Sequence, residues 1–119
     1  MIRIKRLIKS FKYALRGLIK IFHEEQNLRV QSLAAGAVIL AGLYFGLNRF
    51  EWALILIIIS MVILMEIANS AVERVTDVLK PRIDTYVKEI KDIMAAAVML
   101  ASILAIVIGA IIFWPHVFN

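Results

Sequence analysis

Three long stretches of the sequence carry almost no charge, and this feature limits most strongly what the chain can fold into. Residues 30–47 are 18 consecutive uncharged positions, and residues 93–114 are 22 more. Between them, residues 52–72 include one charged side chain, Glu66. A helix rises about 1.5 Å per residue, so such stretches can cross the hydrocarbon core of a bilayer, which is roughly 30 Å thick. The sequence therefore predicts an all-α integral membrane protein with three transmembrane helices.

The composition supports a membrane setting and excludes several kinds of site. Hydrophobic residues make up 62% of the 119 positions. Soluble domains use about 45–50%, and a soluble domain of this size could not bury the excess. The length leaves room for one domain, which we expect to cover residues 1–119. Because there is no cysteine, thiol and disulfide chemistry is excluded, and the separation of His23 from His116 disfavours a histidine metal cluster.

The first part of the chain mixes basic and apolar side chains in a helical pattern. Apolar residues recur at spacings of three and four: Ile4, Leu7, Ile8, Phe11, Leu15, Leu18, Ile19 and Phe22. Basic residues occupy the other faces: Lys5, Lys9, Lys12, Arg16 and Lys20. This pattern predicts an amphipathic helix over about residues 2–24 that lies on a membrane surface. The net charge of +5 is therefore expected to attract the protein to anionic lipid headgroups, and no nucleic-acid partner is expected.

We expect the three transmembrane spans at about residues 28–47, 52–72 and 93–114. Residues 48–51 are predicted to form a tight turn, and residues 80–92 a polar connection or a short helix. The second helix is expected to continue to about Leu79, where Pro81 ends it, because proline disfavours helix in the residue before it. Pro115 is expected to stop the third helix.

Small residues recur at intervals of four in two of the spans. In the first span these residues are Gly42 and Gly46, and in the third they are Ala97, Ala101, Ala105 and Gly109. Small side chains let helix backbones approach closely in a membrane, so both sets predict helix–helix contacts.

The basic residues are distributed unevenly along the chain, which predicts its orientation. The first 29 residues hold eight Lys or Arg, and the first connection holds only Arg49. Five basic residues lie around the second connection: Arg74, Lys80, Arg82, Lys88 and Lys91. By the positive-inside rule, the N-terminus and the second connection lie in the cytoplasm, as expected for a multi-pass protein of a bacterial cytoplasmic membrane.

Acidic residues gather near the predicted cytoplasmic ends of the spans. Four polar residues of the second helix share one face, because their spacing is i, i+3, i+7 and i+11: Glu66, Asn69, Glu73 and Asp77. Glu66 lies within an apolar span, where an ionised carboxylate costs at least about 2.5 kcal/mol. We therefore expect this stripe to face a cavity in the protein, near Glu25 at the start of the first span.

Structural and functional interpretations of these acidic residues are both open. Glu73 and Asp77 can belong to a solvated helix end, and Glu66 with Asn69 can form a hydrogen-bonded pair between helices. As a cluster, the carboxylates suit Mg²⁺, which prefers oxygen ligands shared with phosphates, and nearby basic residues suit a polyphosphate. A carboxylate at lipid depth can serve as a general base on a hydroxyl group. A further alternative is a non-enzymatic transport or assembly protein, in which Glu66 would be a proton or cation site.

The segment at residues 66–77, EIANSAVERVTD, resembles the E-x-x-N-[ST]-A-[IV]-E-x-x-x-D signature of the prokaryotic diacylglycerol kinase family, which includes the undecaprenol kinases. Three further segments match in order and spacing: FKYALRGL at 11–18, EEQNLRVQ at 24–31 and KD-x-x-A-A-A-V at 91–98. The resemblance covers nearly the whole chain. It implies a homotrimeric helical bundle, with a surface helix and three transmembrane helices in each subunit and with active sites shared between neighbours.

The resemblance also implies a reaction. MgATP would donate its γ-phosphoryl group to the hydroxyl group of a membrane lipid, with Glu66 as the general base. Glu25 and Glu73 would hold Mg²⁺, and Asn69 would position the reacting groups. The nucleotide site would be completed by further residues along the chain: Asp77, Lys91 and Asp92, with Tyr13 and Gly17 as a cover and Arg6 and Lys9 as added positive charge.

Two lipid alcohols are open as the acceptor. The connection that contains KPRID resembles the Gram-positive-type members of the family, which favours undecaprenol over diacylglycerol. Two departures from the family pattern matter, the first for the role of Gln31 at the site and the second for the choice of lipid. Gln31 stands where some relatives have an acidic residue or histidine, and residues 95–97 lack a small polar residue that some relatives carry.

Overall fold

The computed structural model describes residues 1–79 and 84–118, so Pro81 and part of the expected polar connection lie outside the described residues. The described residues form four helices and no strand, which confirms the predicted all-α class. The helices are α1 (Ile4–Glu24), α2 (Gln26–Phe45), α3 (Arg49–Leu79) and α4 (Asp84–Val117). The last three are each long and apolar enough to cross a membrane.

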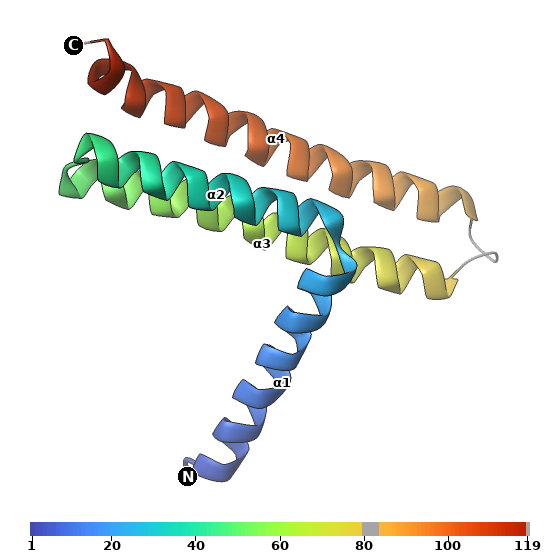
Figure 1. Ribbon diagram of the computed structural model, residues 1–119. Helices are drawn as coiled ribbons and strands as arrows, with labels where there is room; N and C mark the ends of the chain where they lie inside the picture. The colour runs from blue at the N-terminus through green and yellow to red at the C-terminus, as the bar shows by residue number, and fades with distance from the viewer. Residues whose placement is uncertain (80–83, 119) are drawn as a thin grey trace.

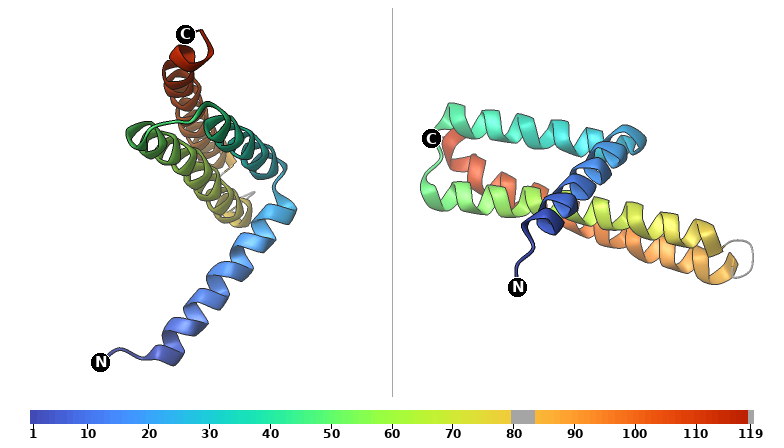
Figure 2. Two further views of the ribbon diagram at one scale, coloured as in Figure 1. Left: turned by 60° about the vertical axis from the view of Figure 1, so that its left-hand side comes forward. Right: turned by 90° about the horizontal axis from the view of Figure 1, so that it is seen from below.

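The helices α2, α3 and α4 lie side by side, whereas α1 leaves this bundle at a steep angle (Figure 1). Figure 2 shows that α1 departs where α2 begins, and that α3 and α4 extend beyond this point. The most extensive packing joins α3 to α4, and α1 contacts α2. No residue of α1 is buried along its fully described length. Its apolar stripe is therefore available to meet a membrane surface.

Helix α4 extends further at both ends than the sequence pattern predicts. Residues 85–92, which were expected in a polar connection or a short helix, belong to the first turns of α4. Pro115 does not stop this helix but lies inside its last turn, and the Phe118 N–H still donates to the Trp114 carbonyl at 3.1 Å. Proline has a backbone φ that a helix accepts, so near the helix end it removes one hydrogen bond without ending the helix. The end of α3 at Leu79 agrees with the prediction.

The connection between α2 and α3 is also shorter than predicted, because α3 already begins at Arg49. Gly46 ends α2 with a φ of 66°, the left-handed conformation that glycine adopts without steric cost. Asn48 and Glu51 then cap α3 reciprocally. The Glu51 N–H donates to Asn48 Oδ1 at 2.8 Å, and the Asn48 N–H donates to Glu51 Oε1 at 3.0 Å. This capping box replaces the predicted tight turn.

Side chains from all three bundle helices meet at this end of the molecule. Glu51 of α3 pairs with His116 of α4, and its Oε2 lies 3.0 Å from Nε2 of the imidazole. Phe45 of α2 contacts the rings of Phe113 and His116, with centroid distances of 6.1 and 6.2 Å. The buried apolar core lies beside them: Leu47, Ile55, Ile58 and Ile112. The apolar core therefore lies toward the end opposite to α1.

The two glycines of the first span have separate roles rather than a shared helix seam. Gly46 is the end of α2, whereas Gly42 is buried against the side chain of Trp52. A Cβ atom at Gly42 would lie 2.8 Å from Trp52 Cη2 and 2.9 Å from Leu47 Cδ1. In the third span, Ala101 is buried, as expected for a packed seam.

Replacing Gly42 by alanine is expected to destabilise the protein by about 1–3 kcal/mol, because the added methyl group must displace the Trp52 ring or the Leu47 side chain. Unfolding by denaturant in detergent micelles measures the change. The matched control is Gly36→Ala in the same helix, where a Cβ atom meets nothing within 4 Å. Equal stability of the two variants would contradict this packing.

Candidate functional site

The polar stripe of α3 faces inward at its deep end and becomes exposed toward its C-terminus. Glu66 is 1% exposed, Asn69 and Glu73 are half-buried, and Asp77 is exposed. The Asn69 amide donates to Glu73 Oε1 at 3.3 Å, which joins two of the predicted site residues. The stripe therefore faces into the protein at Glu66, as expected. At Asp77 it is exposed, because the helix runs beyond the start of α2 (Figure 1).

Glu66 is a buried carboxyl group without hydrogen bonds. Among the described residues, neither of its oxygens makes a hydrogen bond of normal geometry. The Asn27 side chain is the neutral polar group beside it, and the charges of Glu25 and Glu73 also act on it. Leaving a buried acceptor unpaired is costly, so an incoming hydroxyl group that donated to Glu66 would recover the full hydrogen bond. This carboxyl group is therefore suited to accept a proton from a buried alcohol.

Two carboxylates, Glu25 and Glu73, lie within electrostatic range of Glu66. Glu25 is the residue at the junction between α1 and α2, and it reaches the same region as Glu66 and Glu73. Within the described residues, no three acidic or histidine side chains are close enough to hold a metal ion by themselves. Mg²⁺ is usually held by one or two carboxylates together with substrate phosphates. Glu25 and Glu73 thus fit a cation that shares its ligands with a nucleotide.

A second polar contact joins α3 to α4. Lys91 donates to Asp77 Oδ1 at 2.7 Å, which brings two of the predicted nucleotide-site residues together. Lys91 precedes the uncharged stretch at residues 93–114. The neighbouring residue Asp92 is exposed. A charged ammonium group at this position can contact phosphate oxygens.

The predicted residues of α1 lie away from this cluster. Arg6, Lys9 and Tyr13 are exposed on a helix that points away from the bundle (Figure 1). A Cβ atom at Gly17 would meet nothing within 4 Å, so no other helix packs on that face. The Arg16 guanidinium group lies 5.9 Å from the centre of the Tyr13 ring, which is a contact within α1. Within one chain, the structure does not bring these residues to the carboxylates.

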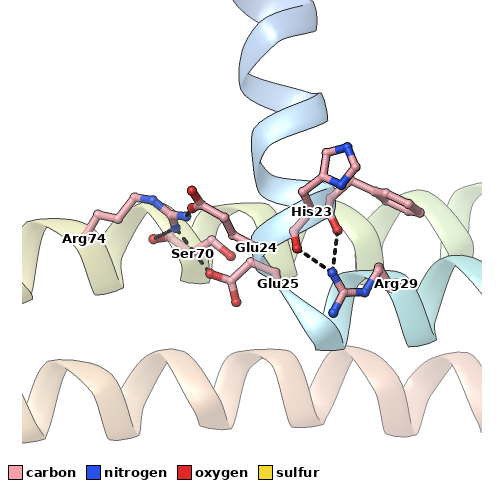
Figure 3. A network of polar contacts seen from close by, with 7 residues as sticks. His23, Glu24, Glu25, Arg29, Ser70 and Arg74 are labelled. Carbon is pink, nitrogen blue, oxygen red and sulfur yellow. Dashed lines mark hydrogen bonds and ion pairs between the residues drawn. The ribbon is translucent and has the colours of Figure 1, made fainter.

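Arg74 is the main site residue that the sequence pattern did not single out. Figure 3 shows its guanidinium group reaching Glu24 and Glu25 at the junction, while Arg29 lies against the end of α1. Ser70, one turn after Glu66, is fully buried, and its hydroxyl group has no hydrogen-bond partner among the described residues. The only signal for Arg74 in the sequence was a basic residue directly after Glu73, which entered the prediction through the charge balance alone.

An apolar crevice of about 530 Å³ lies between α2, α3 and α4. Val62 and Ile63, which line it, are four and three residues before Glu66 and so lie on the adjacent turn of α3. Gln31 also lines the crevice, and its side-chain oxygen is buried without a hydrogen-bond partner among the described residues. The crevice therefore reaches to within about one helical turn of Glu66, which does not itself line it.

Comparison with known proteins gives a consistent set of relatives. Residues 12–113 match the sequence profile of the family described as prokaryotic diacylglycerol kinase. The undecaprenol kinase of Bacillus subtilis (strain 168) is 31% identical over 112 residues, which cover 94% of this chain and 91% of the relative. The diacylglycerol kinase of Haemophilus influenzae is 34% identical over 116 residues, which cover 93% and 95%. That of Escherichia coli (strain K12) is 27% identical over 111 residues, which cover 93% and 91%.

Proposed function

The chain belongs to the prokaryotic diacylglycerol kinase family and is a membrane lipid kinase that uses ATP, and we propose that its preferred acceptor is the hydroxyl group of undecaprenol. The single observation that carries the site assignment is Glu66, a buried carboxyl group whose oxygens have no hydrogen-bond partner among the described residues. In this proposal, Glu66 is the general base that takes the proton of the lipid alcohol as the alcohol oxygen attacks the γ-phosphorus of ATP, and the bond from that phosphorus to the bridging oxygen breaks to release ADP.

The preference for undecaprenol is supported by a relative and by the shape of the bundle. The similar Bacillus subtilis protein is named for undecaprenol, whereas other relatives are named for diacylglycerol. The crevice beside Glu66 is lined almost entirely by apolar side chains. A polyprenol is hydrocarbon up to its hydroxyl group, whereas diacylglycerol also carries ester groups close to its hydroxyl, which an apolar wall would desolvate without pairing. The crevice therefore suits a polyprenol chain better.

The other residues of the site are proposed to position the nucleotide. Glu25 and Glu73 hold Mg²⁺ together with the phosphates of ATP, and Asn69 holds the Glu73 carboxylate by its hydrogen bond. When bound, Mg²⁺ would neutralise charge on the phosphate oxygens. Lys91, oriented by Asp77, supplies positive charge near phosphate, and Asp92 completes this part of the site.

The residues of α1 require a neighbouring subunit or a different position of α1. Tyr13 and Gly17 are proposed to cover the nucleotide, with Arg6 and Lys9 adding positive charge. Because α1 points away from the carboxylates of its own chain, sites shared between subunits of a homotrimer account for these roles. We further propose that the site lies at the cytoplasmic face of a bacterial cytoplasmic membrane, because the basic residues concentrate around the N-terminus and the second connection.

A substrate panel tests the proposed acceptor. Purified protein in mixed micelles is expected to transfer labelled γ-phosphate from MgATP to undecaprenol with a kcat/KM on the order of tenfold higher than that for diacylglycerol, since an apolar pocket discriminates by such factors. Glu66→Gln is the control for transfer that does not depend on the site. Equal rates with the two lipids, or a preference for diacylglycerol, would show that the acceptor is wrongly assigned.

A further inference from the structure

Arg74 attaches the junction of α1 and α2 to α3, directly beside the proposed metal ligands. It follows Glu73 in the sequence, and its guanidinium group has three acceptors (Figure 3). One nitrogen lies 2.5 Å from Glu24 Oε2. The other lies 3.3 Å from Glu25 Oε1 and donates to the Ser70 carbonyl at 3.0 Å. The bond to Ser70 fixes the guanidinium group along α3, so both carboxylates are held at a defined point of that helix.

Few polar contacts hold the junction on α3, beside the apolar packing of Leu28. Glu25 has an extended backbone, with φ of −104° and ψ of 110°, and so separates α1 from α2. Arg29 donates to the carbonyl groups of Phe22 and His23, but this contact joins the end of α1 only to α2. Since α1 buries no side chain, the ion pairs of Arg74 are the charged attachment of the junction to α3 within the described residues, next to the neutral contact of Asn27 with Glu66.

The two ion pairs of Arg74 differ in length. Its guanidinium group lies closer to Glu24 Oε2 than to Glu25 Oε1, which is 3.3 Å away. Glu25 also lies in the electrostatic field of Glu66, as does Glu73. Arg74 therefore anchors the backbone through Glu24 while the carboxylate of Glu25 keeps the freedom to turn toward another cation.

We propose that Arg74 is a positioning residue for the divalent cation of the reaction. Its ion pair with Glu24 places Glu25 at the point where Glu25 and Glu73 can bind the same ion. This inference rests on the proposed function, in which those two carboxylates are the metal ligands. Arg74 acts through Glu25 and touches neither lipid nor nucleotide, as residues around a metal site do when they orient its ligands.

The sign of the effect on metal binding separates positioning from simple electrostatics. A positive charge near a cation opposes its binding, so removing Arg74 would tighten metal binding if charge alone mattered. If Arg74 positions Glu25, both Arg74→Gln and Glu24→Gln weaken Mn²⁺ binding, each about tenfold. Because the two changes break one ion pair, the double variant is expected to bind Mn²⁺ no more weakly than either single variant.

The experiment measures bound Mn²⁺ by electron paramagnetic resonance, on the full-length protein in detergent with a non-hydrolysable ATP analogue. Arg74→Lys is expected to recover part of the affinity, because a lysine still pairs with Glu24. The Mg²⁺ concentration for half-maximal activity should rise about tenfold, with kcat at saturating Mg²⁺ changed less than about threefold. Glu89→Gln, an exposed carboxylate of α4, is the control for a general loss of negative charge.

Three outcomes would overturn the proposal: tighter Mn²⁺ binding by Arg74→Gln, unchanged binding in both single variants, or a kcat lowered about 100-fold at saturating Mg²⁺, since Arg74 would then touch the phosphates.

Glu73→Gln separates this failure from failure of the proposed function. If Glu73→Gln leaves Mn²⁺ binding intact, the metal site itself is wrongly assigned. If it abolishes binding while the Arg74 variants do not change it, only the positioning role is wrong. Should Arg74→Gln fail to fold, Arg74→Lys carries the test, because it keeps the positive charge and changes only the geometry: weaker Mn²⁺ binding than in wild type supports positioning, and unchanged binding contradicts it.

Discussion

Glu66→Gln is expected to lower kcat for phosphoryl transfer by about 100- to 10,000-fold, the range that a general base contributes. Glutamine has the shape of glutamate but cannot take the proton of the lipid hydroxyl. Folding should be preserved, because Glu66 is buried and its oxygens have no hydrogen-bond partner among the described residues. Single-turnover transfer from MgATP measures the rate, and thermal unfolding in the same micelles measures the stability.

Glu89→Gln provides the matched control for Glu66, because it makes the same chemical change at an exposed position of α4. Its kcat should stay at the wild-type value. If Glu66→Gln kept a kcat within about threefold of wild type while Glu89→Gln was unchanged, Glu66 could not be the general base, since such a base contributes at least about 100-fold. The buried carboxyl group would then need another explanation, such as a polar contact between subunits.

Glu73→Gln is expected to reduce kcat/KM for MgATP by at least about 100-fold, because it removes one of two proposed carboxylate ligands. Glu25→Gln should behave in the same way. The amide keeps the hydrogen bond with Asn69 possible, so the loss can be assigned to charge and metal binding rather than to packing. Titration of activity with Mg²⁺ measures the effect, and high Mg²⁺ should restore part of it. A Mg²⁺ dependence identical to that of wild type would rule out the metal assignment for Glu73.

The helical class and the three membrane-spanning helices follow from the sequence because the signal is long and uniform. Uncharged stretches of about 20 residues leave few alternatives, since an exposed backbone must be paired internally in lipid. The inward direction of Glu66 was also predictable, because its spacing from Asn69 and Glu73 places it on the same helix face. These features depend on local sequence alone.

Other features depend on contacts between distant residues, and the pattern did not reveal them. Pro115 was expected to end a helix, but its effect depends on whether the following residues can still bond, as Phe118 does. Glu51 gave no sign that it would cap α3 and also pair with His116, which is 65 positions away. Arg74 meets Glu24 across 50 positions, and that pairing becomes visible only when the angle between α1 and α2 is known.

The distribution of contacts along the bundle has a mechanical consequence. At the end opposite to α1, Glu51 with His116, Phe45 with Phe113, and Gly42 with Trp52 connect every pair of the three bundle helices. Near Glu66, by contrast, buried polar atoms are left without partners among the described residues. The ring contacts that join α2 to α4 therefore lie at the end where Asn48 and Glu51 cap α3. Any tilt of α2 away from α4 would be smallest at that end and largest beside Glu66, where an entering lipid needs the most room.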